Sequence, residues 1–580
     1  MDCSFFNYTS RWLFRSISIY FILIYSVCFI VSVANIPYFE YFFKTINSSI
    51  YNWFSYGGTT AGMVFGESSY YFPIFLGILS IGLFGWGVTF LSSSFYRRAK
   101  SESARLSLSG RAVIFITGAA CIGLCLFGIR GRMGYNPIKV SQAYYCEDPF
   151  LNQLGVNPVF NLLTSTLDDN RKENKTLNLM AEKTALQLVQ NYLRRIGMAE
   201  LSSIAQKVEQ KGVADRKNVV LIFMESMSAN LMGSFGSNKH LTPYLDSLYQ
   251  QSLSFNHFYS AGIHTNHGIY STLFSFPAIM KRNAMKGSVI PVYSGLPTVL
   301  KNNGYCNLFF MTHESQYDNM NAFLRTNGFD EIYAQENYPA EKVVNSFGVQ
   351  DDFMYQYALP ILNEKAKTGN PFFSVLLSIS NHPPYVIPPY FHPRSEKLED
   401  QIVEYADWSI KQFMQAAEKQ PWFDNTVFVF LGDHGKMVGT PECEMPQSYN
   451  HIPLMIYTKG EKPVVHEGYG GQIDVAPTLL GLLNVSYLQN NFGVDLLKEE
   501  RPYMFFTADN LIAARDSSRL FIYSPESQQQ FTYRLEDGKL HAATDEKDFQ
   551  QLKEYCFSML QATEYLVKEN KTTDKVSLKR

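Results

Sequence analysis

The sequence predicts an α/β protein in which N-terminal transmembrane helices precede a doubly wound domain and a small C-terminal antiparallel subdomain. Three observations predict this fold class. Long uncharged runs lie within the first 130 residues, short apolar runs of strand length alternate with polar helical stretches beyond Arg216, and a turn signal divides the C-terminal part. A chain of 580 residues has room for several such domains.

Three runs in the N-terminal region are long and apolar enough to cross a membrane. They cover about residues 16–39, 69–96 and 112–130, and they carry no charge before Arg130. A helix needs roughly 20 residues to span the hydrocarbon core. Three such runs in succession favour membrane helices over buried core helices, and the two spans after the first argue against a cleaved signal peptide. We therefore expect residues 1–135 to form the membrane part.

Basic residues next to these runs predict how the chain crosses the membrane. Arg11 and Arg15 precede the first run, whereas the loop before the second run has Lys44 as its only basic residue. The loop before the third run is rich in basic residues: Arg97, Arg98, Lys100, Arg105 and Arg111. Because basic loops stay in the cytoplasm, three spans place everything beyond the third run outside. We expect a protein of the cell (inner) membrane whose main domain is extracytoplasmic, that is, periplasmic.

Net charge bears on the class of binding partner, and the positions of the cysteines bear on possible disulfides. The chain has 50 basic and 52 acidic side chains and a net charge of -2, so its bulk charge does not favour a nucleic-acid partner. Some of the 8 cysteines lie beyond the third run, where an oxidising space permits up to two disulfides of undetermined pairing. These are Cys146, Cys306, Cys443 and Cys556.

Composition changes along the chain predict the order of the remaining domains. Residues 136–214 mix charges with apolar residues at helical spacing, which predicts a helical linker. Apolar runs of strand length then follow at residues 219–224, 307–311, 372–379 and 426–431. Fully apolar strands separated by helices are typical of a parallel sheet buried on both faces, so we expect this domain over residues 215–500. Residues 501–580 are expected to form the antiparallel subdomain and a tail, with Asp537-Gly538 as a hairpin turn signal.

Polar side chains stand directly after four of the predicted strands. Glu225 follows the first, His313 and His382 follow the next two, and Asp433-His434 follows the last. In open parallel sheets, functional sites lie beyond the carboxyl ends of the strands. The sequence therefore predicts that carboxylates and histidines converge at one edge of the sheet.

Three of these residues predict a metal site. Glu225, Asp433 and His434 offer oxygen and nitrogen ligands for one divalent ion, Mn²⁺ or Zn²⁺, with Mg²⁺ as a further option. Three protein ligands leave an open coordination position, where a hydroxyl becomes acidic and nucleophilic. Thr265, just ahead of an apolar helical run, is the candidate for that position. Taken alone, a threonine at this point also suits an ordinary helix N-cap.

Five motifs resemble those of a known family. They are NVVLIFMES, FYSAGIHTNHG, SNHPPY, FLGDHG and GGQIDVAPTLL, and they are distributed over about residues 215–500. All are similar to motifs of the lipoteichoic acid synthase branch of the alkaline phosphatase/sulfatase superfamily. The resemblance implies a membrane-anchored phosphoglycerol transferase with a threonine nucleophile. Members usually carry five membrane spans, whereas three are predicted here.

The resemblance implies a role for each matching residue. It makes Glu225, Asp433 and His434 metal ligands, and it makes Thr265 both the fourth ligand and the nucleophile. The implied substrate contacts are His382 at the phosphate, His264 as the basic residue ahead of the threonine, and Tyr317, Asp318 and Asn319 in the head-group region. Gram-positive members have a Trp and an Arg in that last region, and neither stands here.

Four further residues have two interpretations each. His313 is either a substrate contact or a satisfied polar residue near the pocket, and His451 is either a phosphate contact or structural. His267 either pairs with His264 as a metal ligand or lies on the helix surface, which the family pattern favours. Asp474 is interpreted as the N-cap of its helix rather than as a ligand.

Together these residues predict a two-step transfer. Thr265 attacks the head-group phosphorus of a phospholipid donor, diacylglycerol departs, and the phosphothreonine diester passes its group to a glycan or glycolipid acceptor. Phosphoethanolamine transfer uses the same chemistry and is the alternative, followed by a sulfatase-like phosphodiesterase or sulfuric ester hydrolase. Sulfatases carry a Cys or Ser with Pro two residues later, a pattern that Thr265-Asn266-His267 does not match. A catalytically inactive binding domain is disfavoured, because all four candidate ligands are present.

Overall fold

The computed structural model describes most of the chain. The described residues are 11–43, 45–54, 57–101, 108–131, 154–170, 177–198, 200–285, 292–315 and 317–574. The chain falls into two compact units. The first is Met1–Ile50 with Ser68–Lys172, and the second is Tyr51–Glu67 with Glu173–Arg580.

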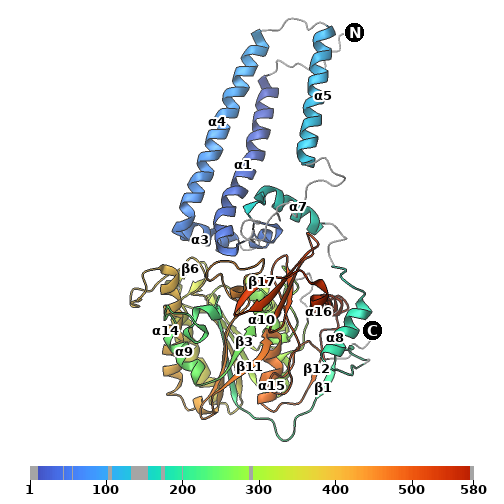
Figure 1. The fold of residues 1–580 in the computed structure, drawn as a ribbon. Coiled ribbons are helices and arrows are strands. Elements are labelled where there is room, and N and C mark those ends of the chain that lie inside the picture. The colour runs from blue at the N-terminus through green and yellow to red at the C-terminus, as the bar shows by residue number, and fades with distance from the viewer. Residues whose placement is uncertain are drawn as a thin grey trace, which may run out of the picture. The chain divides into compact units, whose positions relative to one another are not determined.

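Three long apolar helices dominate the first unit (Figure 1). They are α1 (Arg11–Phe42), α4 (Tyr71–Ser101) and α5 (Leu108–Arg130), and a shorter helix, α7 (Pro158–Asn170), follows them. The candidate spans within the three long helices have mean hydropathies of 2.4, 2.1 and 2.4. Their large apolar side chains are largely exposed, as with Phe115 at 77%, which suits lipid contact and not core packing. The prediction of three helices long and apolar enough to cross a membrane is confirmed.

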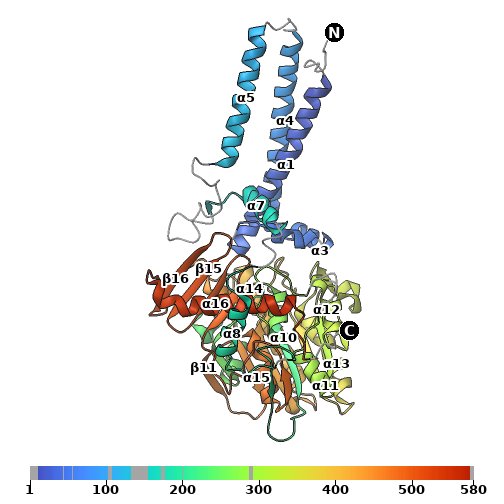
Figure 2. The same ribbon diagram turned by 90° about the vertical axis from the view of Figure 1, so that its right-hand side faces the viewer.

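A mixed eight-stranded sheet forms the centre of the second unit (Figures 1 and 2). In spatial order its strands are β11 (Val464–Gly471), β3 (Leu253–Tyr259), β10 (Leu454–Thr458), β9 (Thr426–Gly432), β2 (Asn218–Met224), β8 (Phe372–Leu377), β4 (Cys306–Met311) and β5 (Glu331–Tyr333). β2 pairs in parallel with both β8 and β9, whereas β10 runs antiparallel to β9 and β3. The four predicted strands are present, and the antiparallel β10 is a feature that the apolar pattern did not predict.

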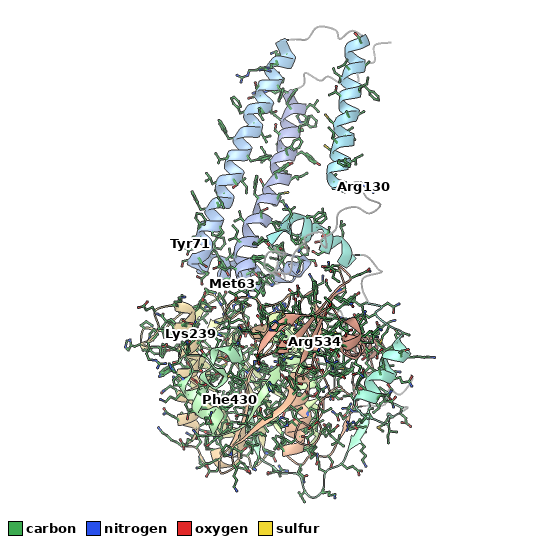
Figure 3. All side chains as sticks on the ribbon, viewed as in Figure 1. Met63, Tyr71, Arg130, Lys239, Phe430 and Arg534 are labelled. Atoms are coloured by element: carbon green, nitrogen blue, oxygen red, sulfur yellow. The ribbon has the colours of Figure 1, made fainter. Side chains whose placement is uncertain are left out.

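Both faces of this sheet are buried, as the fully apolar strands predicted. Along β2, Val219, Leu221 and Phe223 contribute to one apolar core, and the residues between them contribute to the other. Successive side chains of a strand point to opposite faces, so such a strand needs helices on both sides. Those helices are α10 (Thr265–Phe274), α11 (Leu296–Asn302), α15 (Val475–Leu482) and α16 (Gln550–Lys568) on the first core, and α9 (Pro243–Gln250), α13 (Asp351–Ala366) and α14 (Leu398–Ala417) on the second. Figure 3 shows Phe430 of β9 among these packed side chains.

A five-stranded antiparallel sheet near the C-terminus confirms the predicted subdomain. Its strands, in order, are β13 (Met504–Thr507), β14 (Ile512–Arg515), β15 (Arg519–Ser524), β16 (Gln529–Glu536) and β17 (Lys539–Ala542). In the turn between β16 and β17, Asp537 and Gly538 have φ of 49° and 73°. Positive φ at both positions is the hairpin geometry that an Asp-Gly pair favours. The sequence did not predict α16, which packs against α8 (Glu182–Tyr192).

Smaller elements complete the second unit. β1 (Gln206–Val208) pairs with β12 (Tyr487–Gln489), β6 (Val343–Asn345) pairs with β7 (Gly348–Val349), and α12 (Met320–Thr326) precedes β5. The domain boundaries expected at residues 135, 214 and 500 stay predictions.

The described cysteines of the second unit are free thiols. Cys306 is partly buried, and Cys443 and Cys556 are buried. Cys146 lies outside the described residues. Among the residues that the structure describes, therefore, the second unit holds none of the disulfides that the sequence permitted.

Asp474 is an ion-pair partner and not a side-chain cap. Its carboxylate accepts the N–H groups of Gly471 and Val494, both at 3.0 Å, and binds Arg501, whose Nε lies 2.8 Å away. It occupies the N-cap position of α15, although its side chain makes no capping bond there. The predicted N-cap position of Asp474 is therefore confirmed, and its carboxylate also neutralises the buried Arg501 guanidinium.

Asp474→Ala is expected to lower the free energy of unfolding by about 3–5 kcal/mol, because Arg501 would stay buried without its partner. As a control, Asp424→Ala removes the partner of the exposed Lys459 and should change the stability far less, because solvent screens that pair. Denaturant unfolding of both variants measures the difference. Equal losses of stability in the two variants would show that the buried ion pair contributes no more than the exposed one.

Candidate metal centre

The predicted ligands meet where two neighbouring strands end. Met224 of β2 pairs with Gly432 of β9, so the residues that follow them, Glu225 and Asp433, stand side by side. One ligand atom from each of Glu225, Asp433 and His434 lies within 4.8 Å of the others, and all three residues are buried. The structure thus brings these three residues together, whereas metal binding by them stays a prediction.

Hydrogen bonds aim the histidine of this cluster at the carboxylates. The Nδ1 of His434 lies 2.8 Å from the carbonyl oxygen of Gly435. Because a carbonyl oxygen only accepts, Nδ1 carries the hydrogen and Nε2 presents its lone pair. That Nε2 lies 3.7 Å from Glu225 Oε1 and 3.6 Å from Asp433 Oδ2. Metal-binding histidines are held by their other ring nitrogen in the same way.

The two carboxylates of the cluster are short of positive partners. Asp433 Oδ1 accepts the N–H groups of Ser226 and His434, whereas Oδ2 is buried without a hydrogen-bond partner among the described residues. Burial, followed by the nearby Asp433, raises the pKa of Glu225 well above its usual value. Buried charges need a counter-charge. A divalent cation fits this oxygen and nitrogen donor set.

Thr265 lies at the beginning of α10, next to the cluster. Its Oγ1 is 3.4 Å from Glu225 Oε2. The N-cap position of α10 is His264, so the interpretation of Thr265 as an N-cap is wrong. Gly268, one turn further on, lets α10 lie against the backbone of Asp433, because a Cβ there would overlap the Asp433 carbonyl oxygen. The hydroxyl therefore stands between the carboxylate cluster and a helix N-terminus, which attracts anions.

Gln472 joins the loop before Thr265 to the loop that holds Asp433. Its side chain is buried, accepts the N–H of Ala261 at 2.9 Å, and donates to the carbonyl oxygens of Gly432 at 3.0 Å and Asp433 at 2.7 Å. Sequence reasoning did not single out this residue. The available signal was a long polar side chain just ahead of the largely apolar run of the motif GGQIDVAPTLL.

The two histidines beside Thr265 differ in their surroundings. His264 is partly exposed, and its Nε2 lies 2.7 Å from Oδ1 of Asp509, a buried residue that follows β13. His267 is buried, and neither of its ring nitrogens has a hydrogen-bond partner among the described residues. Burial lowers the pKa of His267 to about 3. The expectation of a helix-surface histidine is therefore wrong, because the ring lies in the protein interior.

His382 lies in a loop that is tied to the metal cluster. The preceding Asn381 donates to the carbonyl oxygens of Glu225 at 3.2 Å and Ser226 at 3.1 Å. Its Oδ1 accepts a hydrogen bond from the Nζ of Lys436 at 2.6 Å. Burial lowers the pKa of His382 to about 4. The structure thus brings His382 near the cluster through a rigid connection that the sequence did not predict.

The predicted head-group region reaches the residue after Thr265. Asn266 donates from Nδ2 to Asp318 Oδ2 at 3.2 Å. The ring of Tyr317 lies 4.9 Å from that of His313 and 6.1 Å from that of Phe347, centre to centre. Asn319 belongs to the same short helix, Tyr317–Asn319, and its side chain lies outside the described residues. The amide–carboxylate contact places Asp318 beside the candidate nucleophile.

The other two candidate histidines have structural partners. His313 is buried with Nδ1 at 3.0 Å from the carbonyl oxygen of Glu314, and burial lowers its pKa. His451 Nε2 lies 2.9 Å from the carbonyl oxygen of Asn256, and its ring stacks on Tyr259. These contacts satisfy His451 away from the carboxylate cluster. They support its structural interpretation and give no support to a phosphate contact.

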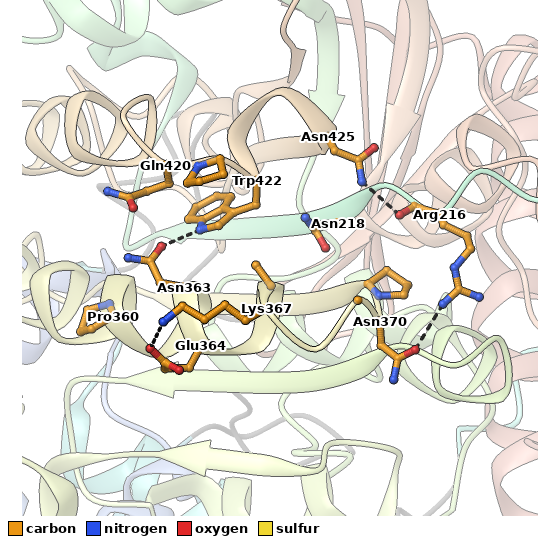
Figure 4. Close-up of a pocket in the computed structure, with 14 residues that line it drawn as sticks. Arg216, Asn218, Pro360, Asn363, Glu364, Lys367, Asn370, Gln420, Trp422 and Asn425 are labelled. Atoms are coloured by element: carbon orange, nitrogen blue, oxygen red, sulfur yellow. Dashed lines mark hydrogen bonds and ion pairs between the residues drawn. The ribbon is translucent and has the colours of Figure 1, made fainter.

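A cavity of about 670 Å³ lies at the amino ends of the central strands, opposite the candidate metal centre (Figure 4). Its lining includes Arg216 and Asn218 at the start of β2, and Trp422 and Asn425 just before β9. Trp422 donates to Asn363 Oδ1 at 2.6 Å. Functional sites of open α/β sheets lie at the carboxyl ends of the strands. Because this cavity lies at the amino ends, it is separate from the candidate metal centre.

Comparisons with known proteins agree with the predicted resemblance. Residues 217–485 match the model of the sulfatase family. Lipoteichoic acid synthase 2 of Bacillus subtilis is 24% identical over 343 residues, which cover 52% of this chain and 51% of that protein. The chain therefore spans about half the length of this curated relative.

Solved structures support the same fold. A protein in the alkaline phosphatase superfamily from Vibrio parahaemolyticus matches with a TM-score of 0.62 and 27% identity, over 68% of this chain and 98% of that one. The lipoteichoic acid synthase LtaP from Listeria monocytogenes matches with a TM-score of 0.55 and 23% identity, over 66% and 98%. The predicted fold class and family resemblance are confirmed.

Gln472→Ala is expected to lower the free energy of unfolding by about 3 kcal/mol or more, because three buried backbone groups would lose their partner. The exposed Gln251 bonds only to Ser247, so Gln251→Ala should change the stability by about 0.5 kcal/mol or less. Thermal or denaturant unfolding of the two variants tests the comparison. A Gln472→Ala protein as stable as the control would remove the bridging role of this side chain.

Proposed function

We propose that this protein is a metal-dependent transferase anchored in a membrane. It moves a phosphoglycerol-type head group from a phospholipid to a glycan or glycolipid acceptor. Residues 217–485 match the sulfatase family model, and the fold is similar to that of a protein in the alkaline phosphatase superfamily. The observation that carries this proposal is the Thr265 hydroxyl, 3.4 Å from Glu225 at a helix N-terminus, beside buried Asp433 and His434. The similarity to lipoteichoic acid synthase 2 and the three apolar helices support a lipid substrate.

The proposed cofactor is one divalent ion, Mn²⁺ or Zn²⁺, with Mg²⁺ as a further option. Glu225, Asp433, His434 and the Thr265 hydroxyl would hold it. The unpartnered Asp433 Oδ2 and the lone pair on His434 Nε2 support this ligand set. When bound, such an ion lowers the pKa of a coordinated hydroxyl and neutralises charge on phosphoryl oxygens.

Thr265 is the proposed nucleophile of the first step and the leaving group of the second. Its Oγ1 attacks the head-group phosphorus, the bond from phosphorus to the diacylglycerol oxygen breaks, and diacylglycerol leaves with a proton. The acceptor hydroxyl then attacks the same phosphorus, and Thr265 recovers its hydroxyl. Thr265 stands at the N-terminus of α10, and the positive end of the helix dipole would stabilise the negative charge that develops on the phosphoryl oxygens in both steps.

Substrate contacts are proposed for residues around the cluster. They are His382 and His264 at the phosphate, and Tyr317, Asp318, Asn319 and His313 at the head group. The hydrogen bonds of Asn381 to the Glu225 backbone support the position of His382. The contact from Asn266 to Asp318 supports a head-group site next to Thr265.

Phosphoethanolamine transfer is the second candidate function, and one observation favours it. The Asp318 carboxylate stands beside Asn266, the residue after the proposed nucleophile. An ammonium group pairs with a carboxylate through charge-assisted hydrogen bonds. A carboxylate in the head-group region therefore suits ethanolamine as well as the hydroxyls of glycerol.

The domain is proposed to face the outside of the cell (inner) membrane, that is, the periplasm. The basic residues between 97 and 111 and the three spans support this orientation. A donor phospholipid in the outer leaflet would then be within reach of the site.

Metal analysis of the purified protein is expected to give about one equivalent of a divalent ion, because the described residues contain one such ligand cluster. Asp433→Ala should reduce the metal content sharply, because it removes a buried carboxylate ligand. Asp548→Ala, which changes a carboxylate paired with Arg519 and Arg534, should leave the content unchanged. Full metal content in Asp433→Ala would contradict the proposed site.

Thr265→Ala is expected to lower diacylglycerol release by about 10³-fold or more, since the nucleophilic oxygen is gone. Thr265→Ser keeps a hydroxyl and should retain part of the activity. The assay uses phosphatidylglycerol and phosphatidylethanolamine separately, with mass spectrometry of the quenched protein. A head-group phosphate adduct is expected on the peptide with Thr265, and its mass distinguishes the two candidate functions. Near wild-type turnover by Thr265→Ala, or an adduct elsewhere, would reject the mechanism.

A further inference from the structure

The connection between the first two membrane helices belongs to the same compact unit as the α/β domain. This connection, Tyr51–Glu67, clusters with Glu173–Arg580 and not with the helices on either side of it. It holds α2 (Tyr51–Phe54) and α3 (Gly57–Gly66), and Met63 marks α3 in Figure 3. Within it, Glu67 is the only charged residue. Its function is not explained by the metal centre.

α3 contacts two loops of the α/β domain through its glycines. A Cβ added at Gly62 would lie 2.5 Å from the Cβ of Ser346, and one added at Gly66 would lie 3.6 Å from Pro384 Cγ. Only a glycine permits the first approach. The two loops are themselves joined, because Asn345 donates from Nδ2 to the carbonyl oxygen of Pro384 at 3.2 Å. α3 therefore rests directly on these loops.

The same two loops form the surroundings of His382. Pro384 lies two residues beyond His382 in the motif SNHPPY. Phe347, the residue after Ser346, has its ring 4.3 Å from that of His382, centre to centre. The loops that α3 contacts are therefore the same loops that contain or touch His382, the proposed phosphate contact.

The connection also carries exposed aromatic rings. Phe54 is 70% exposed, Phe65 is 66% exposed and Tyr51 is 45% exposed. α1 ends at Phe42 and α4 begins at Tyr71, so short chain segments hold this connection close to the ends of two membrane helices. Aromatic side chains are favoured at the membrane–water interface. The absence of lysine and arginine in residues 51–67 argues for an apolar contact and against attraction by charge.

We propose that α2 and α3 form a lipid-receiving ledge, on which the acyl chains of the donor phospholipid lie while its head group reaches His382. The ledge is defined by Tyr51, Phe54 and Phe65. The occupant is the donor lipid, because the ledge joins membrane helices at both ends and the substrate loops along one side. This inference rests on the proposed function, since it requires a phospholipid donor.

The double variant Phe54→Ser/Phe65→Ser tests this ledge in the full-length protein. The assay compares a long-chain donor in mixed micelles with a dihexanoyl donor that is soluble as a monomer. With the long-chain donor, kcat/KM should fall about tenfold, the factor that corresponds to about 1.4 kcal/mol of lost contact. With the dihexanoyl donor, kcat/KM should not change, because short chains do not reach the ledge.

Two further variants separate lipid contact from a folding defect. Phe54→Leu/Phe65→Leu keeps apolar side chains and should retain most of the long-chain activity. Ile196→Ser removes a 96% exposed apolar side chain elsewhere in the same unit and should affect neither substrate. Equal losses with both donors, or no loss with the long-chain donor, would overturn the inference.

Diacylglycerol release by the wild-type protein distinguishes a failure of the proposed function from a failure of the ledge. Release of diacylglycerol from neither phosphatidylglycerol nor phosphatidylethanolamine would overturn the proposed function, and the ledge with it. Release from either lipid, combined with an unchanged chain-length preference in the double variant, would overturn the ledge alone.

Discussion

Two buried carboxylates at the ends of adjacent parallel strands constrain the rest of this site. The pairing of Met224 with Gly432 forces Glu225 and Asp433 to lie next to one another. Both are buried, and the pKa of Glu225 is raised by this burial and by its neighbour. A proton or a positive partner stabilises such a pair. Among the described residues Asp433 Oδ2 has no hydrogen-bond partner, and His434 is held by its Nδ1, which is compatible with the proposed cation.

Neutral hydrogen bonds from distant segments hold the surrounding loops in place. Gln472 joins the loop before Thr265 to Asp433, and Asn381 joins the loop of His382 to Glu225. Neither side chain adds charge to a site that already has an excess of negative charge. A reacting group must be held to within a fraction of an ångström. These two bridges connect the loops that carry Thr265, the carboxylates and His382.

Segments outside the central sheet also reach this site. Asp509, which follows the first strand of the C-terminal sheet, pairs with His264 beside Thr265. α3, between two membrane helices in the sequence, packs on the loops around His382. The α/β domain therefore supplies the candidate site residues, while the C-terminal sheet and the 51–67 connection contact the residues and loops around them.

By itself, the sequence determined the features that depend on neighbours along the chain. Uncharged runs predicted α1, α4 and α5, and fully apolar strands predicted a sheet with two buried faces, because hydrophobic periodicity reports local burial. Residues directly after strands predicted the cluster of Glu225, Asp433 and His434. Tertiary structure alone decided the burial of His267, the bridge through Gln472 and the pairing of His264 with Asp509, residues 245 positions apart. Such contacts depend on how whole elements pack, and no local pattern of residue types records that packing.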